Sequence, residues 1–495
     1  MEKVWQHDWM SKWAIYSPDK VAVGQLDTGE VLTYGELNRN AEKLGLLLYH
    51  RFGLRKGDRI AVLDEMTNNL VTLGFACQKY GYILVPINYR LAAEEVSGIF
   101  RDADPAIIFV ADLFRHLIQD EFTERVKTIE PDFLTAEYTP VQLPEIREDD
   151  VLFLIYTSGT TGKPKGVKYT HKMAFWNSIN TSISLIINTE TVTINVMPPF
   201  HTGGWNVLLM PILHHGGTVY MAKKFEASTT IQALEKHRCT VFMGVPTMLS
   251  FMADDKYFDS ADLSSLDYII VGGESMPIPL IERYDRKGIA IRQGYGMTEV
   301  GPNLTSLHQS DAIRKKGSIG RPNFYVMTRV INEEGLDSEP NTPGELWLSG
   351  PMVTPGYWNN IEETQKAFAE DGRWFRTGDI VIRDDEEYYY IVDRLKNMFI
   401  SGAENVYPAE IERVLIQLPE VKECVVVGVK DEKWGEVGMA LIVRNNGSLT
   451  EEKLIEYCRG RLAKFKVPKY FRFMEELPKT ESGKLDRKKL KTIFY

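Results

Sequence analysis

Six short apolar runs constrain the fold more than any other feature of the sequence. Turns or helix-length segments with polar periodicity separate each run from the next. The runs are Ile60–Leu63, Ile83–Val85, Ile107–Val110, Val151–Tyr156, Val241–Met243 and Tyr268–Val271. Continuous apolar runs of this length are typical of strands that are buried on both faces of a mainly parallel sheet. The sequence therefore predicts an α/β fold, with a large N-terminal domain of mainly parallel sheets and helices.

A helix is predicted directly after Thr33. Thr33 and Glu36 form a T-x-x-E capping box, in which each side chain accepts a hydrogen bond from the other residue's backbone N–H. Apolar residues then recur at the spacing of one helix face. They are Leu37, Ala41, Leu44 and Leu48.

The texture of the sequence changes near Asp393, where a second and smaller domain is predicted. Its final hundred residues indicate an α+β unit with strands and one helix. The strands are Val425–Val429, Ala440–Val443 and Tyr470–Met474, and the helix is expected from about Glu451 to Leu462. We therefore expect a large domain over residues 1–395 and a small domain over residues 396–495.

The composition is that of an ordinary folded protein and excludes several other classes. Of the 495 residues, 44% are hydrophobic and 25% are charged, unlike disordered, collagen-like or coiled-coil chains. The 58 Lys and Arg residues against 68 Asp and Glu residues give a formal net charge of −10. A general nucleic-acid binder needs a basic surface, so this class is not expected. Only residues 461–491 are locally basic, and they could meet a polyanionic ligand.

The cysteines and the apolar stretches together favour a cytoplasmic location. The four cysteines fall at no metal-binding spacing, and we interpret them as buried thiols in a reducing compartment. The first ten residues carry charges of both signs, and no apolar run reaches the roughly 18 residues that a membrane span needs. The sequence therefore predicts no signal peptide and no transmembrane segment, and it leaves a homodimer open.

A loop rich in Gly, Ser, Thr and Lys follows the predicted strand Val151–Tyr156. Its glycines let backbone amides close on an anion, its hydroxyls supply short donors, and its lysines add charge. It differs from a Walker loop, because Thr157 replaces the first glycine and Pro164 stands where Ser or Thr would ligate magnesium. The predicted phosphate-binding residues are Thr157, Ser158, Gly159, Thr160, Thr161, Gly162 and Lys165.

With this loop the chain resembles the adenylate-forming superfamily of acyl-CoA synthetases, peptide-synthetase adenylation domains and luciferases. The family signature TSGTTGKPKG stands unaltered at residues 157–166, and the resemblance runs from about Tyr34 to Leu490. Further family motifs follow in order at residues 199–201, 272–274, 294–299, 317–322, 374–379, 393–394, 404–412 and 479–484. Eight motifs in the family's order are far more specific than any one of them.

The resemblance implies an enzyme that uses ATP, Mg²⁺ and CoA. A carboxylate first attacks the α-phosphate of ATP to give acyl-adenylate and pyrophosphate, and a thiol then displaces AMP. Glu299 resembles the family's magnesium ligand, Lys484 its adenylation lysine and His201 its gate beside the acyl carboxylate. Asp379 resembles the acceptor of both ribose hydroxyls, and Arg394 the cation near ribose and phosphate.

The remaining site residues are also carried over from the family. The adenine-flanking set is Gly272, Gly273, Glu274, Gly294, Tyr295, Gly296, Met297 and Thr298. The acyl-pocket set is Trp205, Met243 and Gly244. Lys396 holds the family's hinge position, and the CoA-side set is Gly402, Ala403, Glu404 and Trp434. Ala403 departs from the usual S-G-G-E-N pattern, which makes thiol transfer less secure than adenylation.

Several alternatives stay open at this point. We expect a medium- or long-chain fatty acid as substrate, with aryl acids second. A dicarboxylic acid such as succinylbenzoate ranks lower, because the predicted pocket stretches carry no Arg or Lys for a second carboxylate. A freestanding enzyme that loads a carrier protein is an alternative to CoA, and a non-catalytic ligand sensor is a different class. The intact Lys484, Glu299 and Asp379 weigh against a sensor.

Overall fold

The described part of the chain forms two compact units. The computed structural model describes residues 7–128, 136–142, 144–157, 164–273, 276–370, 372–401, 404–445, 449–479, 485–487 and 489–490. The first unit contains residues 1–328 and 348–375, and the second contains residues 329–347 and 376–495. The domain boundary predicted between residues 395 and 396 falls inside the second unit and stays a prediction.

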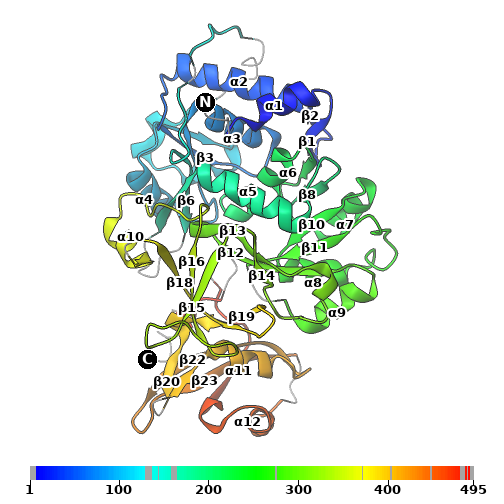
Figure 1. Ribbon diagram of the computed structural model, residues 1–495, viewed down its shortest axis with the longest axis vertical. Helices are drawn as coiled ribbons and strands as arrows, with labels where there is room; N and C mark the ends of the chain where they lie inside the picture. The colour runs from blue at the N-terminus through cyan, green and yellow to red at the C-terminus, as the bar shows by residue number, and fades with distance from the viewer. Residues whose placement is uncertain are drawn as a thin grey trace. The chain divides into compact units, whose positions relative to one another are not determined.

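A five-stranded sheet in the order β5-β3-β4-β6-β7 carries the predicted phosphate loop in the first unit. Figure 1 labels two of its strands, β3 and β6. The pairs β5–β3, β3–β4 and β4–β6 are parallel, whereas β7 pairs antiparallel with β6. The elements are β3 (Arg59–Leu63), α3 (Asn68–Tyr80), β4 (Ile83–Pro86), α4 (Ala93–Ala103), β5 (Ile107–Val110), β6 (Val151–Thr157) and β7 (Lys165–Thr170). The four apolar runs predicted as strands here are confirmed.

A second five-stranded sheet has the order β10-β11-β12-β13-β14. Its first three strands are parallel and its last two are antiparallel additions. The elements are β10 (Val241–Gly244), α8 (Pro246–Asp254), β11 (Tyr268–Val271), α9 (Ile278–Arg286), β12 (Ile291–Met297), β13 (Gly301–Ser306) and β14 (Arg321–Pro322). The two remaining predicted strands are thereby confirmed, and so is the α/β fold class.

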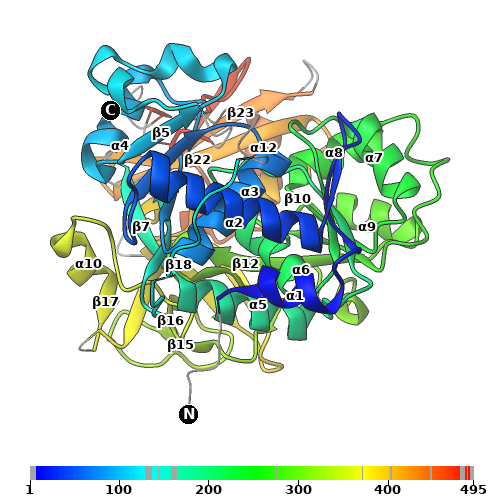
Figure 2. The ribbon, with the colours of Figure 1, turned by 90° about the horizontal axis from the view of Figure 1, so that it is seen from above.

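A third, mixed sheet in the order β2-β1-β9-β8 completes the first unit. Helices α1, α2 and α3 lie side by side near it (Figure 2). The predicted capping box is present, because Thr33 Oγ1 accepts from Glu36 N–H and Glu36 accepts from Thr33 N–H. The remaining elements are α1 (Trp9–Tyr16), β1 (Val21–Gln25), β2 (Val31–Thr33), α2 (Tyr34–Arg51), α5 (His171–Leu185), β8 (Val192–Asn195), α6 (Leu209–His214), β9 (Thr218–Met221), α7 (Ala227–Lys236), α10 (Ile361–Ala367) and β17 (Phe368–Ala369).

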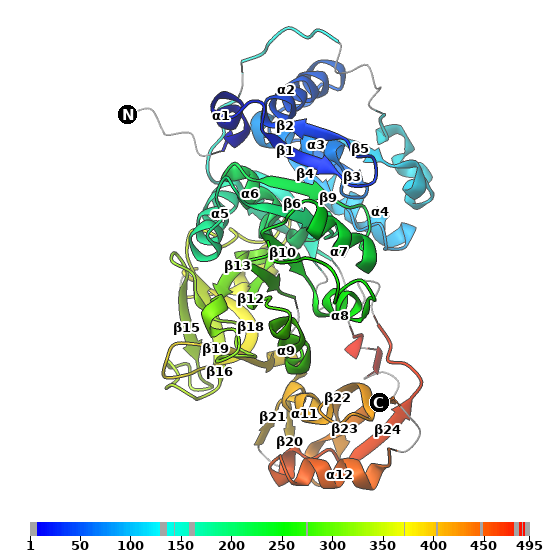
Figure 3. The ribbon, with the colours of Figure 1, turned by 90° about the vertical axis from the view of Figure 1, so that its right-hand side faces the viewer.

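The second unit is built on the sheet β21-β20-β23-β22, with β24 paired to β23 (Figure 3). Alternate residues of β22 point to opposite faces, so Val426 packs into one apolar cluster and Val425 and Val427 into another. The elements are β20 (Phe399–Ser401), β21 (Glu404–Val406), α11 (Pro408–Leu415), β22 (Val421–Asp431), β23 (Gly435–Arg444), α12 (Glu451–Arg459) and β24 (Tyr470–Met474). The predicted strands are confirmed, and α12 ends before the predicted Leu462 because Gly460 caps it.

Four further strands lie mainly in the second unit, and β19 pairs antiparallel with β18. They are β15 (Met327–Ile331), β16 (Gly344–Ser349), β18 (Trp374–Arg383) and β19 (Tyr389–Arg394). The four cysteines are buried and free, as the sequence predicts. Among the described residues, no helix combines the length and the apolar character that crossing a membrane requires.

Candidate active site

The predicted phosphate-binding loop joins two adjacent antiparallel strands. Thr157 ends β6, Lys165 begins β7, and these two residues pair across the ladder. The loop residues between them lie outside the described residues, namely Ser158, Gly159, Thr160, Thr161 and Gly162. The strand pairing therefore fixes the entry and the exit of the loop next to each other.

Lys165 lies between an acidic side chain and an aromatic ring. Its ammonium group contacts the Glu363 carboxylate and is 5.2 Å from the centre of the Tyr357 ring. Both charged side chains are largely shielded from solvent, with 12% of Lys165 and 20% of Glu363 exposed. The hydrogen bond from Lys165 holds the pKa of Glu363 below its usual range. Sequence reasoning missed Tyr357 and Glu363, which lie outside the family motifs considered.

Backbone hydrogen bonds fix the segment that carries Tyr357 against β7. They run from Lys168 N–H to Gly356 O over 3.2 Å and from Trp358 N–H to Gly166 O over 2.7 Å. Helix α10, which carries Glu363, follows within a few residues. The geometry around Lys165 is therefore set by the main chain and not by flexible side chains alone.

Glu299, the predicted magnesium ligand, is buried beside the same tyrosine. It lies in the short helical turn Thr298–Val300, and 8% of the residue is exposed. The Tyr357 hydroxyl donates to Glu299 Oε1 over 3.1 Å, and Thr354 N–H donates to Glu299 O over 2.7 Å. Burial, with the nearby carboxylate, raises the pKa of Tyr357, so the phenol stays protonated and donates. One oxygen of Glu299 is thus held in a fixed direction.

The donor set fits a magnesium ion that is bound mainly through nucleotide phosphates. Magnesium typically takes one or two carboxylates and completes its shell with phosphate oxygens and water. Glu299 supplies such a carboxylate in a buried position. Among the described residues, no group of three or more His, Cys, Asp or Glu side chains could hold a metal ion without further ligands.

The predicted adenine-flanking residues follow the parallel strands of the second sheet. Gly244 pairs with Val271, and Val271 pairs with Gln293 on β12, so the three strands end at one edge. Gly272 and Gly294 lie close to each other there, because a Cβ on Gly272 would be 3.9 Å from Gly294 O. Glycine at both positions keeps this edge open to a flat ligand.

Two further glycines of this set are required by their backbone geometry. A Cβ on Gly296 would lie 2.1 Å from Pro302 O, and Gly273 has a φ of +86°. Thr298 is buried, whereas Glu274 lies outside the described residues. The partly exposed members, which can face a ligand, are Gly272, Gly294, Tyr295, Gly296 and Met297.

The predicted acyl-pocket residues differ in their surroundings. Met243 lies at the segment after His201, because a Cβ on Gly203 would be 3.9 Å from Met243 Cε. Trp205 is fully buried in the core, and its indole N–H donates to Pro199 O over 2.8 Å. Met243 therefore borders the His201 segment directly, whereas Trp205 fixes the turn that precedes it. The pocket role of both residues stays a prediction.

His201 is partly exposed and packs on Phe200, with 4.6 Å between the ring centres. On the same Phe200 ring lies the guanidinium group of Arg90, 5.5 Å from the ring centre. Arg90 precedes α4 and is far from His201 in the sequence, so only the fold brings the two near one aromatic ring. A cation thus lies close to the predicted acyl gate, which the sequence did not reveal.

The second unit holds the predicted ribose-binding carboxylate in an ion pair. Asp379 on β18 is the register partner of Arg394 on β19. Arg394 Nε lies 2.5 Å from Asp379 Oδ1, and 3% of the Asp379 side chain is exposed against 46% of Arg394. The Asp379 N–H also donates to Thr377 Oγ1 over 3.1 Å. The carboxylate is therefore fixed and buried, whereas the guanidinium group is open to solvent.

The predicted hinge residue Lys396 is exposed in a short helical turn that a buried carboxylate holds. Asp393 accepts from the Asn397 side-chain amide over 2.9 Å and from Ala409 N–H over 2.8 Å. This tie joins the chain on both sides of Lys396. Asp393 therefore anchors the chain around Lys396, a role that sequence reasoning missed.

The chain next to the predicted adenylation lysine is anchored in the second unit. Lys484 itself lies outside the described residues, as do Gly402 and Ala403. Arg487 donates from Nη2 to both carboxylate oxygens of Glu412 over 2.7 Å, and from Nη1 to a backbone carbonyl. Burial raises the pKa of Glu412, and the Arg487 guanidinium opposes this rise.

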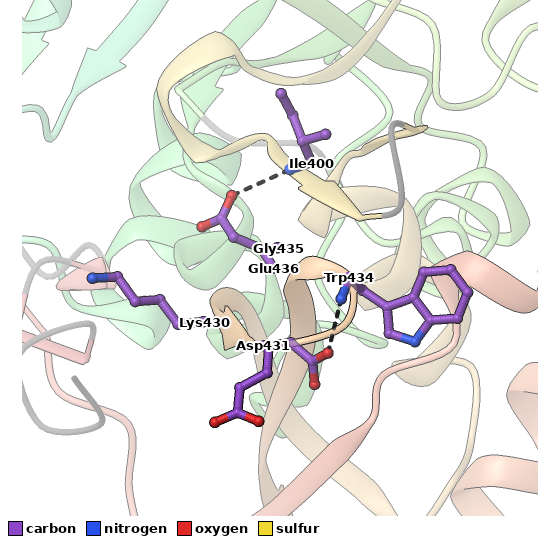
Figure 4. A pocket seen from close by; sticks show the side chains of 7 residues that line it. Ile400, Lys430, Asp431, Trp434, Gly435 and Glu436 are labelled. Carbon is purple, nitrogen blue, oxygen red and sulfur yellow. Dashed lines mark hydrogen bonds between the residues drawn. The ribbon is translucent and has the colours of Figure 1, made fainter.

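A pocket of about 640 Å³ opens beside the predicted CoA-side residue Trp434 (Figure 4). It is lined by Ile400, Lys430, Asp431, Glu432, Trp434, Gly435 and Glu436. Trp434 is 47% exposed, and the Lys433 ammonium lies 4.9 Å from its ring centre. Glu404, also exposed, begins β21. The lining carries three acids and one lysine, so the CoA-side role of Trp434 stays a prediction.

The chain belongs to the AMP-binding enzyme family. The AMP-binding enzyme model matches residues 10–358, and the model of the AMP-binding enzyme C-terminal domain matches residues 410–484. The predicted membership of the adenylate-forming superfamily is confirmed, and with it the class of an AMP-forming acid–thiol ligase.

Individual relatives extend over almost the whole chain. A feruloyl-CoA synthase of Amycolatopsis sp is 37% identical over 488 residues, which are 98% of this chain and 98% of that protein. A long-chain-fatty-acid–CoA ligase of Mycobacterium tuberculosis is 35% identical over 97% of this chain and 96% of that protein.

A solved structure shows the same fold. The o-succinylbenzoate CoA synthetase from Bacillus subtilis, in complex with its acyl-adenylate intermediate, has a TM-score of 0.89 and 30% identity, with 98% of each chain covered. The same synthetase has also been solved with ATP and a magnesium ion. ATP, Mg²⁺ and CoA, the predicted cofactor and co-substrates, fit this family.

Proposed function

We propose that this chain joins an apolar carboxylic acid, foremost a medium- or long-chain fatty acid, to CoA in two steps. The acid's carboxylate attacks the α-phosphate of ATP, which forms acyl-adenylate and releases pyrophosphate. The CoA thiol then attacks the acyl carbonyl, and AMP leaves. The observation that carries this proposal is that Tyr357 joins two charged residues beside the phosphate loop, with Lys165 over its ring and buried Glu299 at its hydroxyl.

In the first step, residues of the first unit bind and orient the triphosphate. Lys165 offers its ammonium to phosphate oxygens at the exit of the loop, and the loop amides add donors. Glu299 directs its carboxylate toward magnesium, with one oxygen held by the Tyr357 hydroxyl. Magnesium, when bound with ATP, neutralises phosphate charge. Gly272 and Gly294 leave room for the adenine ring.

In the same step, residues of the second unit bind the ribose and the reacting groups. Asp379 is buried and paired with Arg394, and its carboxylate oxygens are suited to accept hydrogen bonds from both ribose hydroxyls. Lys484 stabilises the charge that develops between the acid's carboxylate and the α-phosphate. We propose that motion at Lys396 then removes Lys484 and admits the thiol.

The fatty-acid proposal rests on the apolar surroundings of the His201 segment. Met243 and Met197 both border Gly203, because a Cβ there would lie 3.9 Å and 3.6 Å from their Cε atoms. Methionine side chains are flexible and adapt to an irregular apolar chain. Arg90 stacks on Phe200 and does not belong to the predicted lining, so a second carboxylate remains the lower-ranked choice.

An aryl acid is the second candidate. The partly exposed His201 ring, which packs on buried Phe200, offers an aromatic surface to such a substrate. The similarity to a feruloyl-CoA synthase supports this candidate as well. Both candidates use the same two-step chemistry.

A pyrophosphate-release screen tests the proposal and separates the candidates. Purified full-length protein is mixed with ATP, Mg²⁺, CoA and one acid from a panel of short, medium, long, aromatic and dicarboxylic acids. We expect the fastest release with medium or long fatty acids, and AMP in equal amount. Fastest release with hydroxycinnamates would favour the aryl candidate, and preference for a dicarboxylate that Arg90→Met abolishes would overturn both. If none of the acids in the panel caused pyrophosphate release, the proposed function would be contradicted.

A further inference from the structure

Glu363 forms an ion pair with Lys165, the cation that the proposed function assigns to the triphosphate. The Lys165 ammonium contacts Glu363 Oε2, and both side chains are mostly buried. A carboxylate and a phosphate oxygen compete for the same donor, because both are anionic acceptors of an ammonium hydrogen bond. Lys165 can therefore turn its full charge to a nucleotide only after it leaves Glu363.

The other oxygen of Glu363 already has a second cation. Glu363 Oε1 lies 3.3 Å from the Lys366 ammonium on the next turn of α10, and 61% of the Lys366 side chain is exposed. If Lys165 leaves, Glu363 keeps a partner at the protein surface and is not left as a lone buried charge. The exchange of partners thus removes a large part of the energetic barrier to breaking the pair.

Lys165 contacts an aromatic ring at the same time as Glu363. Its ammonium lies 5.2 Å from the centre of the Tyr357 ring, where a cation–π interaction is favourable. Two backbone hydrogen bonds hold this ring against β7. The ring therefore keeps Lys165 at the loop in either state.

We propose that Glu363 is an internal competitor of ATP, an anion that neutralises Lys165 in the empty site and hands it to the triphosphate on binding. In this proposal Lys165 serves the β- and γ-phosphates, which AMP lacks, so Glu363 lowers the affinity for ATP and leaves the affinity for AMP almost unchanged. This inference rests on that function. It adds a residue that tunes nucleotide discrimination.

The test compares nucleotide binding by the full-length parent and two isosteric variants. Glu363→Gln removes the competing charge, and Glu362→Gln is the matched control, since Glu362 is 79% exposed and pairs with Lys366. Calorimetry is done with ATP and with AMP, without any carboxylic acid, so that no turnover occurs. Thermal unfolding checks that all three proteins are folded.

We expect Glu363→Gln to bind ATP about tenfold more tightly than the parent and AMP within about twofold of it. Glu362→Gln should match the parent for both nucleotides. Lys366→Met should weaken ATP binding a few-fold, because the displaced Glu363 then lacks its second cation. Unchanged or weaker ATP binding by folded Glu363→Gln would overturn the inference. A parent that binds neither nucleotide would instead overturn the proposed function itself.

Discussion

Two ion pairs, one in each unit, hold predicted nucleotide contacts in opposite ways. In the first unit, Lys165 is 12% exposed and its partner Glu363 is 20% exposed. In the second unit, the carboxylate of Asp379 is 3% exposed, whereas its partner Arg394 is 46% exposed. The first pair is shielded at both its cation and its anion, whereas the second encloses its anion and leaves its cation open to solvent.

The difference indicates which member of each pair serves the nucleotide. Lys165 is shielded and already neutralised, so it meets a ligand only by changing partners. In the second pair the guanidinium group of Arg394 is open to solvent, so a ligand can approach this pair from the Arg394 side while the ion pair stays intact. The first pair is suited to a polyanion that outcompetes a carboxylate, and the second to neutral hydroxyls that only add hydrogen bonds.

The largest effect is expected where neither pair acts, at Lys484. Lys484→Ala should slow adenylation about a hundred- to a thousandfold, because one preorganised donor to the developing charge is lost. Thiolysis of isolated acyl-adenylate should be spared. Acid-dependent pyrophosphate exchange and thioester formation are measured separately, with Lys479→Ala as the control, since Lys479 is 49% exposed and pairs with Glu423. An equal loss of rate in both steps would contradict a specific role of Lys484 in adenylation.

The next effect concerns the enclosed anion of the second unit. Asp379→Asn should weaken the binding of ATP and AMP alike, by about ten- to a hundredfold, because charged hydrogen bonds to the ribose are lost. Calorimetry with both nucleotides measures this, and the exposed Asp385→Asn serves as control. If only ATP binding were weakened, Asp379 would act at the phosphates and not at the ribose, which would contradict the contrast drawn between the two ion pairs.

A smaller effect is expected at the enclosed cation of the first unit. Lys165→Met should weaken ATP binding about tenfold and leave AMP binding unchanged, because AMP lacks the phosphates that Lys165 serves. Lys172→Met is the control, as Lys172 lies on α5 and pairs with Glu148. If AMP binding fell as much as ATP binding, the two pairs would not serve different parts of the nucleotide.

The smallest effect belongs to Arg394, the exposed member of its pair. Arg394→Met should reduce acid-dependent pyrophosphate exchange only about threefold, since an exposed charge is screened by water. Asp379 keeps its hydrogen bond to the Thr377 segment in this variant. A loss as large as that of Asp379→Asn would mean that the pair acts as one unit.

The strands and the first long helix could be predicted because local sequence determines them. Uniform apolar runs define β3, β4, β5, β6, β10 and β11, and the Thr33–Glu36 capping box defines the start of α2. The family motifs likewise led to the prediction of Lys165, Glu299, Asp379 and Arg394 as site residues, which stays a prediction. These signals are contiguous in the sequence, so no tertiary information is needed to read them.

The partners of those residues could not be predicted. Tyr357 and Glu363 reach Lys165 through pairing of the chain near residue 357 with β7, across almost two hundred residues. Arg90 lies near the Phe200 ring although about a hundred residues separate them in the sequence. Such contacts depend on how strands and loops pack, and the local sequence around Glu363 or Arg90 does not predict them.

Transfer of labelled oxygen tests the central claim most directly, namely that the chain forms an acyl-adenylate. The preferred acid is labelled with ¹⁸O in its carboxylate and converted with ATP and CoA, and the products are analysed by mass spectrometry. We predict one ¹⁸O atom in each AMP and none in pyrophosphate, because the carboxylate oxygen attacks the α-phosphate and stays on it when the thiol displaces AMP. Label in pyrophosphate or inorganic phosphate, or unlabelled AMP, would contradict the account.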